Sequence, residues 1–306
     1  MVPAHLGCIH FEGNRMRAFT ALTGRLVAFV SFMAAVGLTH ATGHGEQLSA
    51  ALEAQPDRAK ARYQYRHPAE TLNFFGIKPG MTVVEVLPGG GWYSRILMPY
   101  LGAGGTLIGA DYNVEIYRHL GFWSEQELAA KQTWAQDWPK RASKWAGDDS
   151  SAVRAFVMGK MPDSFRSSAD AVLLIRLLHN PQRVRSKSDT DYTSEILKDT
   201  FDVLKPGGTV GVVQHQAREY KSDEWASGRR GYLKKSWVIS RLEAAGFIFV
   251  GESDINANPK DQPGDKDYVW RLPPTLIGSR NDPELRKKYR EIGESNRMTL
   301  KFVKPE

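Results

Sequence analysis

Two groups of residues in this sequence have the types and spacing to do chemistry, and the first surrounds three glycines. Residues 85–91 read Glu-Val-Leu-Pro-Gly-Gly-Gly, and Asp111 follows 20 residues after Gly91. Glycines permit a tight turn and let a ligand approach the backbone closely. An acid at the end of the following strand can accept hydrogen bonds from the ribose of a nucleoside. The candidate cofactor-binding residues are therefore Glu85, Pro88, Gly89, Gly90, Gly91 and Asp111.

The second group is His179, Asn180 and His215, which follow two later apolar runs. An unperturbed histidine has a pKa near 6.5 and suits a general base at neutral pH. Asn180 can hydrogen-bond an acceptor oxygen or nitrogen. A structural hydrogen bond at a strand end explains either histidine equally well. No third ligand stands at a recognisable spacing from the two histidines, so we predict no metal site.

Short apolar runs bounded by glycine and proline predict the strands that position these residues. They lie at residues 83–87, 107–110, 155–158, 169–175, 209–213 and 248–251. Continuous apolar runs of this kind are typical of buried parallel strands. Helical spacing predicts helices at residues 93–100, 194–204 and 236–247. The alternating run at residues 298–303 predicts an antiparallel edge strand, so the fold class is α/β.

Several kinds of loop contain glycines in this arrangement. A dinucleotide-binding loop would need a glycine where Ser94 stands. A phosphate-binding P-loop would end in Gly-Lys-Ser/Thr, which is absent. A glycine-rich turn with no ligand stays open. The nucleoside-binding loop of a methyltransferase is the fourth possibility, because there an acid inside the first strand precedes the glycines.

Over nearly its whole length after residue 41, the chain resembles the class I S-adenosylmethionine-dependent methyltransferases. The residues that carry the resemblance are 83–85 with 89–91, Asp111, 169–175, the Leu-Lys-Pro-Gly-Gly turn at 204–208, and 242–247. More narrowly, residues 74–85 followed by 88–93 resemble a group of exported bacterial predicted methyltransferases of undefined substrate. In one position the chain departs from the family, since Leu87 stands where the first glycine is usual.

The resemblance implies a Rossmann-like fold with a seven-stranded, mostly parallel sheet, an antiparallel last strand and helices on both faces. It implies S-adenosyl-L-methionine at the carboxyl ends of the first two strands. In that arrangement Glu85 would orient the loop or the methionine end of the ligand. Gly89 and Gly91 would give the ligand access to the backbone, and Asp111 would bind the ribose.

The first forty residues differ from the rest of the chain. Three arginines precede an apolar run at residues 26–38, and small residues follow at positions 39 and 41. A run of 13 residues is too short to span a bilayer comfortably. We therefore predict a cleaved signal peptide at residues 1–41, with Met16 as an alternative start. This predicts a periplasmic or secreted bacterial protein with no stable membrane span after cleavage.

Charge and cysteine content narrow the function further. The 306-residue chain has a formal charge of +7 at pH 7, and its basic residues are spread along the sequence. Without a basic cluster, nucleic-acid binding has little support. The single cysteine, Cys8, would be removed with the signal, which excludes thiol and zinc-thiolate mechanisms in the mature chain. We expect a small-molecule substrate.

We predict a single domain at residues 42–306, because neither a repeat nor a low-complexity linker interrupts it. An aromatic-rich insertion occupies about residues 112–152. Its aromatic side chains could line a substrate pocket or form a core of the insertion's own. A polar loop insertion occupies about residues 254–295.

The predicted function is methyl transfer from S-adenosylmethionine to a small-molecule acceptor, with the two histidines and Asn180 on the acceptor side. The methyl donor is made in the cytoplasm, whereas the signal predicts export. A second class therefore stays open, a catalytically inactive protein of this fold that binds a nucleoside-like or other small ligand in the periplasm. A nucleotide-dependent oxidoreductase is disfavoured by Ser94, where its third glycine would stand.

Overall fold

A computed structural model describes residues 43–306 of the chain. The chain divides into two compact units, residues 1–45 and 46–306, and the description below concerns the second. The predicted signal peptide, Met16 and Cys8 lie outside the described residues. No helix among residues 43–306 combines the length and the apolar character needed to cross a membrane.

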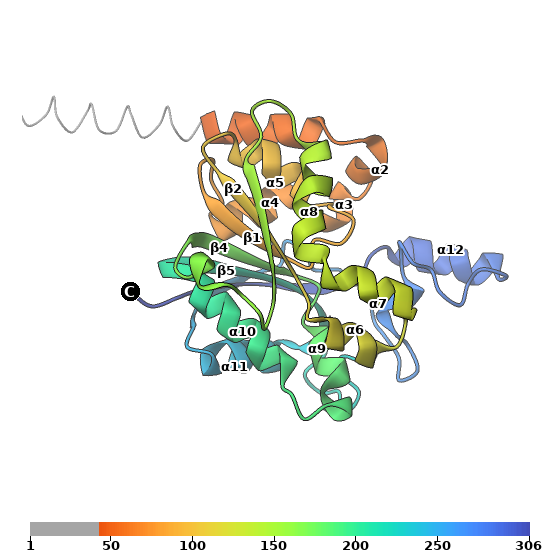
Figure 1. The fold of residues 1–306 in the computed structure, drawn as a ribbon. Helices are drawn as coiled ribbons and strands as arrows, with labels where there is room; N and C mark the ends of the chain where they lie inside the picture. The colour runs from red at the N-terminus through yellow and green to blue at the C-terminus, as the bar shows by residue number, and fades with distance from the viewer. Residues whose placement is uncertain (1–42) are drawn as a thin grey trace, which may run out of the picture. The chain divides into compact units, whose positions relative to one another are not determined.

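Seven strands form a continuous sheet in the order β3-β2-β1-β4-β5-β8-β7, and a short strand, β6, pairs with β5 (Figure 1). Their bounds are β1 Thr82–Val86, β2 Thr106–Asp111, β3 Ala152–Val157, β4 Ala169–Ile175, β5 Leu204–Ala217, β6 Leu233–Lys234, β7 Ile248–Ser253 and β8 Arg297–Val303. All neighbours pair in parallel except β8, which is antiparallel to both β5 and β7. This confirms the predicted α/β, Rossmann-like architecture, with a mostly parallel sheet whose last strand in sequence is antiparallel.

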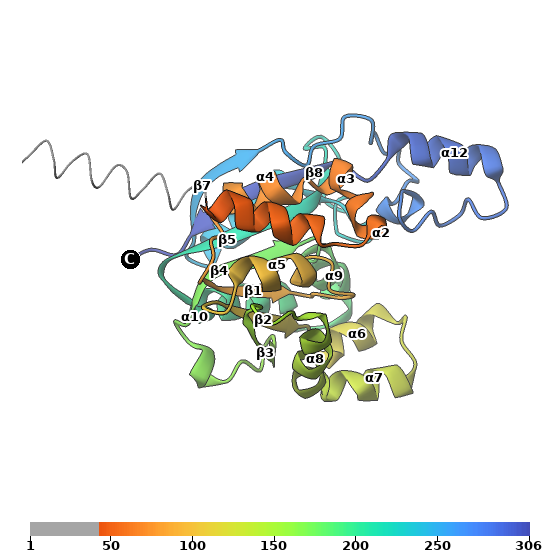
Figure 2. The ribbon, with the colours of Figure 1, turned by 90° about the horizontal axis from the view of Figure 1, so that it is seen from above.

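Helices cover both faces of the sheet (Figure 2). Along β1, Val83 faces a core shared with α4, α5 and α8, whereas Val84 and Val86 face a core shared with α6, α10 and α11. Residues 43–53 are also helical, and Leu48 and Ala51 of that helix pack in the first core. The remaining bounds are α2 Asp57–Lys60, α3 Tyr63–Arg66, α4 Pro68–Phe75, α5 Ser94–Leu101, α6 Val114–Leu120, α7 Glu125–Gln132, α8 Trp134–Ala142, α9 His179–Val184, α10 Tyr192–Val203, α11 Lys235–Ala244 and α12 Pro283–Ile292.

The carboxyl ends of the parallel strands meet at one edge of the sheet. Val86 pairs with Ala110 on one side and Leu174 on the other, and Ile175 pairs with Val213. Whatever follows these strands therefore emerges together. The glycine loop, Asp111, the segment 176–180 and the end of β5 all lie at this edge.

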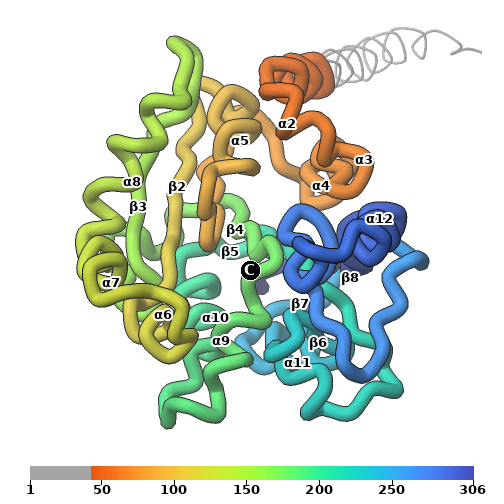
Figure 3. The backbone as a smooth tube through the Cα atoms, turned by 90° about the vertical axis from the view of Figure 1, so that its right-hand side faces the viewer, coloured from red at the N-terminus to blue at the C-terminus, as the bar shows by residue number. Residues whose placement is uncertain are grey.

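The segment that follows α12 lies beside α3, near the N-terminal end of the domain (Figure 3). Arg297 Nη1 donates to the carbonyl oxygen of Tyr65 at 3.0 Å, although the two residues are 232 apart in sequence. Glu294 forms an ion pair with Arg62, just before α3. Residues from the two ends of the domain therefore meet next to the carboxyl edge of the sheet.

The prediction that the last strand lies at an edge is wrong. β8 lies between β5 and β7, and all its residues but Lys301 and Val303 are buried. The strand at this edge of the sheet is β7, whose Ile248 and Val250 are each 54% exposed. Alternation indicates that a strand has one more exposed face but does not say which strands flank it. Exposed and half-buried residues alternate along the whole of β7, whereas most of β8 is buried.

Candidate functional site

The loop between β1 and α5 has three residues in the left-handed backbone region. Gly89 has φ of 54° and Gly91 of 78°, which glycine adopts freely. Leu87 has φ of 56°, in a region that disfavours a residue with a Cβ by about 1–2 kcal/mol. The backbone therefore takes the conformation of a glycine loop even where leucine replaces the first glycine. Gly89 and Gly90 are exposed, and Pro88 is buried.

Glu85 ties this loop to the helix that follows it. The side chain is buried, and Ser94 Oγ, in the first residue of α5, donates to Glu85 Oε2 at 2.6 Å. Burial raises the pKa of Glu85 to about 7, and the hydrogen bond from Ser94 offsets only part of that effect. Glu85 is therefore linked to the start of α5 through Ser94, and its predicted role in orienting the loop stays a prediction. Contact with a ligand stays a prediction.

Gly91 is covered by Trp145, which the sequence did not associate with the loop. A Cβ built on Gly91 would lie 2.2 Å from Trp145 Cζ3. Trp145 is the last residue of η1 (Ser143–Trp145), and the Arg95 guanidinium lies 4.2 Å from the centre of its ring. The backbone access predicted at Gly91 is therefore taken by an indole in this structure. Access remains at Gly89 and Gly90.

Asp111 ends β2 at the predicted place, but its carboxylate is already bonded. Its Oδ1 accepts hydrogen bonds from Tyr117 Oη and from the backbone N–H of Tyr112. Its Oδ2 accepts from Lys131 Nζ of α7 at 2.8 Å. Asp111 is only 2% exposed. A ribose at Asp111 would have to take the place of Lys131, whose side chain is partly exposed and can swing away.

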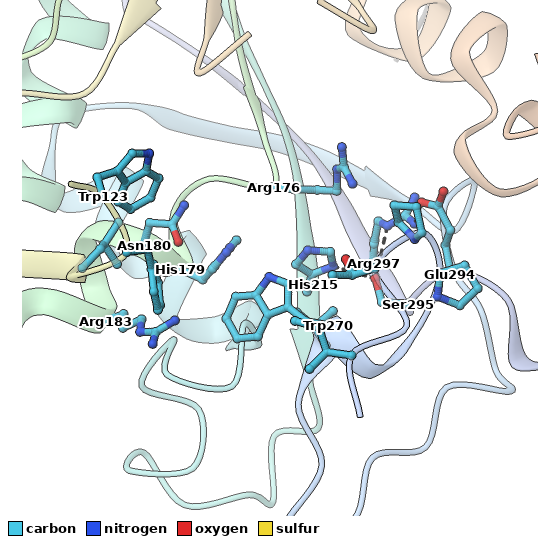
Figure 4. A pocket seen from close by; sticks show the side chains of 17 residues that line it. Trp123, Arg176, His179, Asn180, Arg183, His215, Trp270, Glu294, Ser295 and Arg297 are labelled. Atoms are coloured by element: carbon cyan, nitrogen blue, oxygen red, sulfur yellow. Dashed lines mark hydrogen bonds and ion pairs between the residues drawn. The ribbon is translucent and has the colours of Figure 1, made fainter. Parts of the chain in front are cut away.

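His179, Asn180 and His215 are brought together, as predicted, and line one cavity of about 610 Å³. The centres of the two imidazole rings are 5.5 Å apart. In Figure 4 the histidines lie in the middle of the cavity, with Asn180 and Trp123 at one end and Arg297 with Glu294 at the other. The volume suits a small organic molecule.

Both histidines depart from the ordinary pKa that the sequence suggested. Burial lowers the pKa of His179 to about 4, helped by Arg176 and Arg183. Burial also lowers the pKa of His215 well below its ordinary value, with His179 and Arg297 adding to the effect. Both rings are therefore neutral at pH 7. The expectation of an unperturbed base is wrong because both residues are desolvated and face cations.

The tautomer of His179 follows from its hydrogen bonds. Gln214 Nε2 donates to the carbonyl oxygen of Gly231 at 3.2 Å, and the same nitrogen lies 3.3 Å from His179 Nδ1. Because an amide nitrogen only donates, Nδ1 of the neutral ring accepts and the proton is on Nε2. His179 is thus a hydrogen-bond donor. His215 Nδ1 lies 2.6 Å from Ser295 Oγ, which leaves His215 Nε2 for a ligand.

Asn180 is linked to the predicted cofactor side through Tyr112. Asn180 Nδ2 donates to Tyr112 Oη at 3.4 Å, and Tyr112 Oη donates to the carbonyl oxygen of Leu177 at 2.6 Å. Tyr112 follows Asp111 directly and gives it a backbone N–H. The two groups of predicted residues are therefore connected at this point.

A cluster of four arginines around Glu294 lies at the other end of the cavity, and the sequence analysis missed it. Arg62, Arg66 and Arg297 each form an ion pair with Glu294. Burial opposes ionisation of Glu294, but the four arginines outweigh it and lower its pKa to about 2. The fourth is Arg176, directly after β4, with φ of 57°. These residues are spread over the whole domain, so no local pattern could have found them.

None of the six predicted cofactor residues lines this cavity. Arg66 connects the cavity wall with the glycine loop, because it pairs with Glu294 of the wall and its guanidinium lies 4.6 Å from the centre of the Trp92 ring, next to Gly91. The apolar part of the wall comes from the two predicted insertions. Phe122 and Trp123 belong to the first, and Trp270, Pro273 and Pro274 to the second.

Comparison with known proteins places this geometry beside several methyltransferases. No family model matches the chain. Sterol 24-C-methyltransferase ERG6B of Gibberella zeae is 28% identical over 247 residues, which cover 76% of this chain and 55% of that protein. The chain thus spans about half the length of the curated relative that it matches.

Among solved structures, similar chains include one from the complex of the Haloferax volcanii Trm112 methyltransferase activator with a methyltransferase. It is 17% identical, covering 85% of this chain and 98% of that one, with a TM-score of 0.47. A SAM dependent methyltransferase from Aquifex aeolicus is 18% identical, covering 66% and 93%, with a TM-score of 0.44. The strand order and pairing of the sheet define the fold.

Proposed function

We propose that this chain binds S-adenosylmethionine and transfers its methyl group to a small-molecule acceptor. The observation that supports this best is the loop after β1, with Leu87, Gly89 and Gly91 all left-handed, beside an acid at the end of β2. In a sheet of this order, a nucleoside binds at the carboxyl ends of those two strands. The curated methyltransferase that is 28% identical supports the same activity.

The residues present fit such a cofactor if Lys131 moves and the ligand approaches the loop at Gly89 and Gly90, leaving Trp145 over Gly91. Gly89 and Gly90 are open to solvent, so a ligand can approach their backbone. Asp111 can accept hydrogen bonds from ribose hydroxyls once Lys131 leaves Oδ2. Glu85 keeps the loop attached to α5 while this happens. When bound, the cofactor supplies a methyl group on a positively charged sulfonium.

The cavity beside the loop supplies the groups that an acceptor needs. His179 donates from Nε2 and fixes an acceptor oxygen or nitrogen, and Asn180 adds a second polar contact. His215 is neutral at pH 7 and holds a lone pair on Nε2 if Nδ1–H donates to Ser295 Oγ, so it can take the acceptor's proton. The apolar walls exclude water from the transfer. Positioning and proton removal are what this chain's residues contribute.

A second candidate is a protein of this fold that binds a nucleoside-like ligand without catalysis. Trp145 over Gly91 and Lys131 on Asp111 support it, because both occupy places that a cofactor would need. The two candidates differ in turnover. Binding of S-adenosylhomocysteine without methyl transfer to any acceptor would favour the second.

Calorimetric titration of the full chain with S-adenosylmethionine and S-adenosylhomocysteine tests the cofactor proposal. We expect micromolar binding that Asp111→Ala reduces by at least about tenfold, since two ribose hydrogen bonds are lost. Asp163→Ala is the matched control, because Asp163 is an exposed acid shortly after the neighbouring strand β3. No binding up to millimolar ligand would exclude methyl transfer.

We also propose export, on the strength of the N-terminal pattern alone. The three arginines, the apolar run at residues 26–38 and the small residues at positions 39 and 41 support a signal that is cleaved after Ala41. Mass spectrometry of the protein expressed in a Gram-negative host provides the test. A mature N-terminus at residue 42 in the periplasmic fraction is expected, and an intact chain confined to the cytoplasm would contradict it.

A further inference from the structure

The cavity that holds the two histidines has an excess of positive charge in its wall. Arg176, Arg183 and Arg297 line it, and Glu294 is the one acid among its lining residues. Glu294 is also shared with Arg62 and Arg66 behind the wall. One carboxylate is therefore the counter-charge of several guanidinium groups. A buried charge that lacks a full counter-charge is unfavourable unless a ligand supplies it.

Arg176 is the arginine with no partner of its own. Its guanidinium makes no hydrogen bond or ion pair within residues 43–306, whereas Arg297 bonds Glu294, Tyr65 and Ser295. Burial lowers the pKa of Arg176 well below its ordinary value, and Arg66 and Arg297 lower it further. Glu294 offsets only part of this effect. The cation is thus held in a place that disfavours it.

The backbone of Arg176 is fixed in place, although its side chain has no partner within residues 43–306. Arg176 has φ of 57°, and its N–H donates to the carbonyl oxygen of Val213 at 2.6 Å. A left-handed arginine is unfavourable by about 1–2 kcal/mol. Strain and an unpaired charge at one residue that lines a cavity are typical of a ligand site. In Figure 4 the Arg176 side chain extends on the same side as the Arg297–Glu294 end of the cavity.

The other cation in the wall, Arg183, is already engaged with aromatic rings. Its guanidinium lies 4.8 Å from the centre of the Phe122 ring and 5.5 Å from that of Trp270. Trp270 in turn lies 5.8 Å from the His179 ring. This end of the cavity therefore offers flat apolar surfaces, while the Arg176 end offers an unbalanced positive charge. The ligand that fits both ends is an organic anion with a flat or apolar body.

We propose that this cavity binds an organic anion, with its carboxylate or phosphate on Arg176 and its apolar body against Trp123 and Trp270. We further infer that this anion is the methyl acceptor, a step that rests on the proposed methyl transfer. The carboxylate of the cofactor's own methionine is the other possible source of an anion. The predicted cofactor residues lie outside the cavity wall, which favours a separate acceptor.

An anion at Arg176 would also change the histidines beside it. Arg176 lowers the pKa of both His179 and His215, and Arg183, Arg297 and Arg66 contribute at one ring or the other. A bound carboxylate or phosphate cancels part of that positive field and raises both pKa values. The acceptor itself would therefore make His215 a stronger base when it binds.

Calorimetric titration of the full chain with benzoate, phenyl phosphate and neutral benzamide tests the proposal. We expect the charged probes to bind at least about tenfold tighter than benzamide, because a charge-assisted hydrogen bond is the stronger kind. Arg176→Gln should abolish that preference, and Arg176→Lys should keep part of it. Arg185→Gln is the control, since Arg185 is exposed nearby at the end of α9. Equal binding of charged and neutral probes, or an unchanged Arg176→Gln variant, would overturn the anion site.

The same titrations with saturating S-adenosylhomocysteine separate the two sources of the anion. Benzoate binding that persists beside S-adenosylhomocysteine supports a separate acceptor. Competition between them would assign Arg176 to the methionine carboxylate and overturn the acceptor inference. If benzoate binds in preference to benzamide but S-adenosylhomocysteine does not bind, the proposed methyl transfer is excluded and the anion site alone stands.

Thermal unfolding shows whether a variant has a folding defect. Arg176→Gln removes a half-buried cation that has no partner within residues 43–306, so its Tm should equal or exceed that of the wild type. Weaker benzoate binding in a variant that is at least as stable supports a binding role. If Arg176→Gln unfolds, the comparison of benzoate with benzamide on the wild type still decides the charge preference.

Discussion

At the scale of single residues, the most unusual group outside the cavity is Glu85. It lies on the face of β1 that packs against α5, among apolar side chains, and Ser94 is its hydrogen-bond donor. Its pKa is raised from an ordinary 4.5 to about 7 because burial disfavours the charged form. Near neutral pH a substantial fraction of the folded protein therefore holds this acid protonated. Its charge state is coupled to the stability of the loop it supports.

Replacing this acid by its amide predicts a pH-dependent gain in stability. The folded pKa of Glu85 is raised, so the stability that its neutral form contributes is complete below pH 4.5 and is lost as pH rises to about 7. Glu85→Gln, which cannot ionise, should gain on the wild type across that window, by up to about 3 kcal/mol above pH 7. Urea unfolding at pH 5 and pH 8 measures the difference.

Glu125→Gln provides the control for that experiment, because Glu125 is an exposed acid in the first turn of α7. Its effect on the free energy of unfolding should be within about 0.5 kcal/mol at both pH values. A Glu85→Gln variant whose advantage is the same at pH 5 and pH 8 would show that Glu85 is ionised in the fold throughout.

At the scale of elements, the loop after β1 and the 3₁₀ turn that ends in Trp145 form one packed unit. The indole fills the space that a side chain at residue 91 would need. The left-handed backbone there also favours glycine. Gly91 is therefore required for two separate reasons, one steric and one conformational, and a pair of variants can separate them.

Gly91→Ala should lower the free energy of unfolding by about 2 kcal/mol or more, from the clash and the strain together. In a Trp145→Ala background the clash disappears, and the loss should fall to the roughly 1 kcal/mol expected of the strain. Denaturant unfolding of the four proteins gives the coupling between the two sites. Additive effects would mean that Trp145 does not cover Gly91 in solution.

How far the sequence predicts these elements depends on how local their causes are. β1, β4 and α5 were predicted within a residue or two because apolar runs and glycines mark them locally. The position of β8 inside the sheet was not predicted, because it depends on which strands lie on either side of it. The contact between Trp145 and Gly91 was missed for the same reason, because only the packing of η1 against the loop brings the two residues together. Of the two uses expected for the aromatic-rich segment, Trp123 lines the cavity, whereas Trp138 packs in the core shared with α4 and α5 and not in a core of the insertion's own.

At the scale of the whole domain, the cavity is assembled from segments that the sequence keeps far apart. His179 follows β4 and His215 lies in the last part of β5. The connection between α6 and α7 supplies Trp123. Glu294 comes just before β8, and Arg297 is its first residue. The sequence predicted the histidine pair because both follow strands of one parallel sheet. It could not predict the lowered pKa values or the arginine cluster, because burial and partners are set by tertiary packing.

The wall that carries Trp270 is held by a buried ion pair. Asp261 is 1% exposed and accepts hydrogen bonds from Arg271 Nη2 at 2.8 Å, from Tyr232 Oη at 2.9 Å and from the backbone N–H of Asn296 at 3.0 Å. Asp261 thus connects Tyr232, just before β6, with Arg271, next to Trp270, and with Asn296, just before β8. Residues predicted as a polar loop insertion include this fixed anchor.

Asp261→Asn should lower the free energy of unfolding by about 3 kcal/mol, because it leaves the buried Arg271 without its full counter-charge. Benzoate binding should weaken in the same variant, since the wall next to Arg271 loosens. Asp265→Asn is the matched control, because Asp265 pairs with Lys221 at the surface. Urea unfolding and calorimetry provide both values. Equal, small effects of the two variants would mean that the ion pair does not anchor the wall.

The central claim is that the loop after β1 and the acid at the end of β2 bind S-adenosylmethionine, and a crystal structure of the chain with S-adenosylhomocysteine tests it most directly. We predict ribose hydroxyls within hydrogen-bond distance of Asp111, with Lys131 turned away. The ligand should lie along Gly89 and Gly90, and the cavity between Arg176 and Trp270 should stay open for the acceptor. Crystals grown in millimolar ligand that show none at this loop, or show it only in the arginine cavity, would contradict the account.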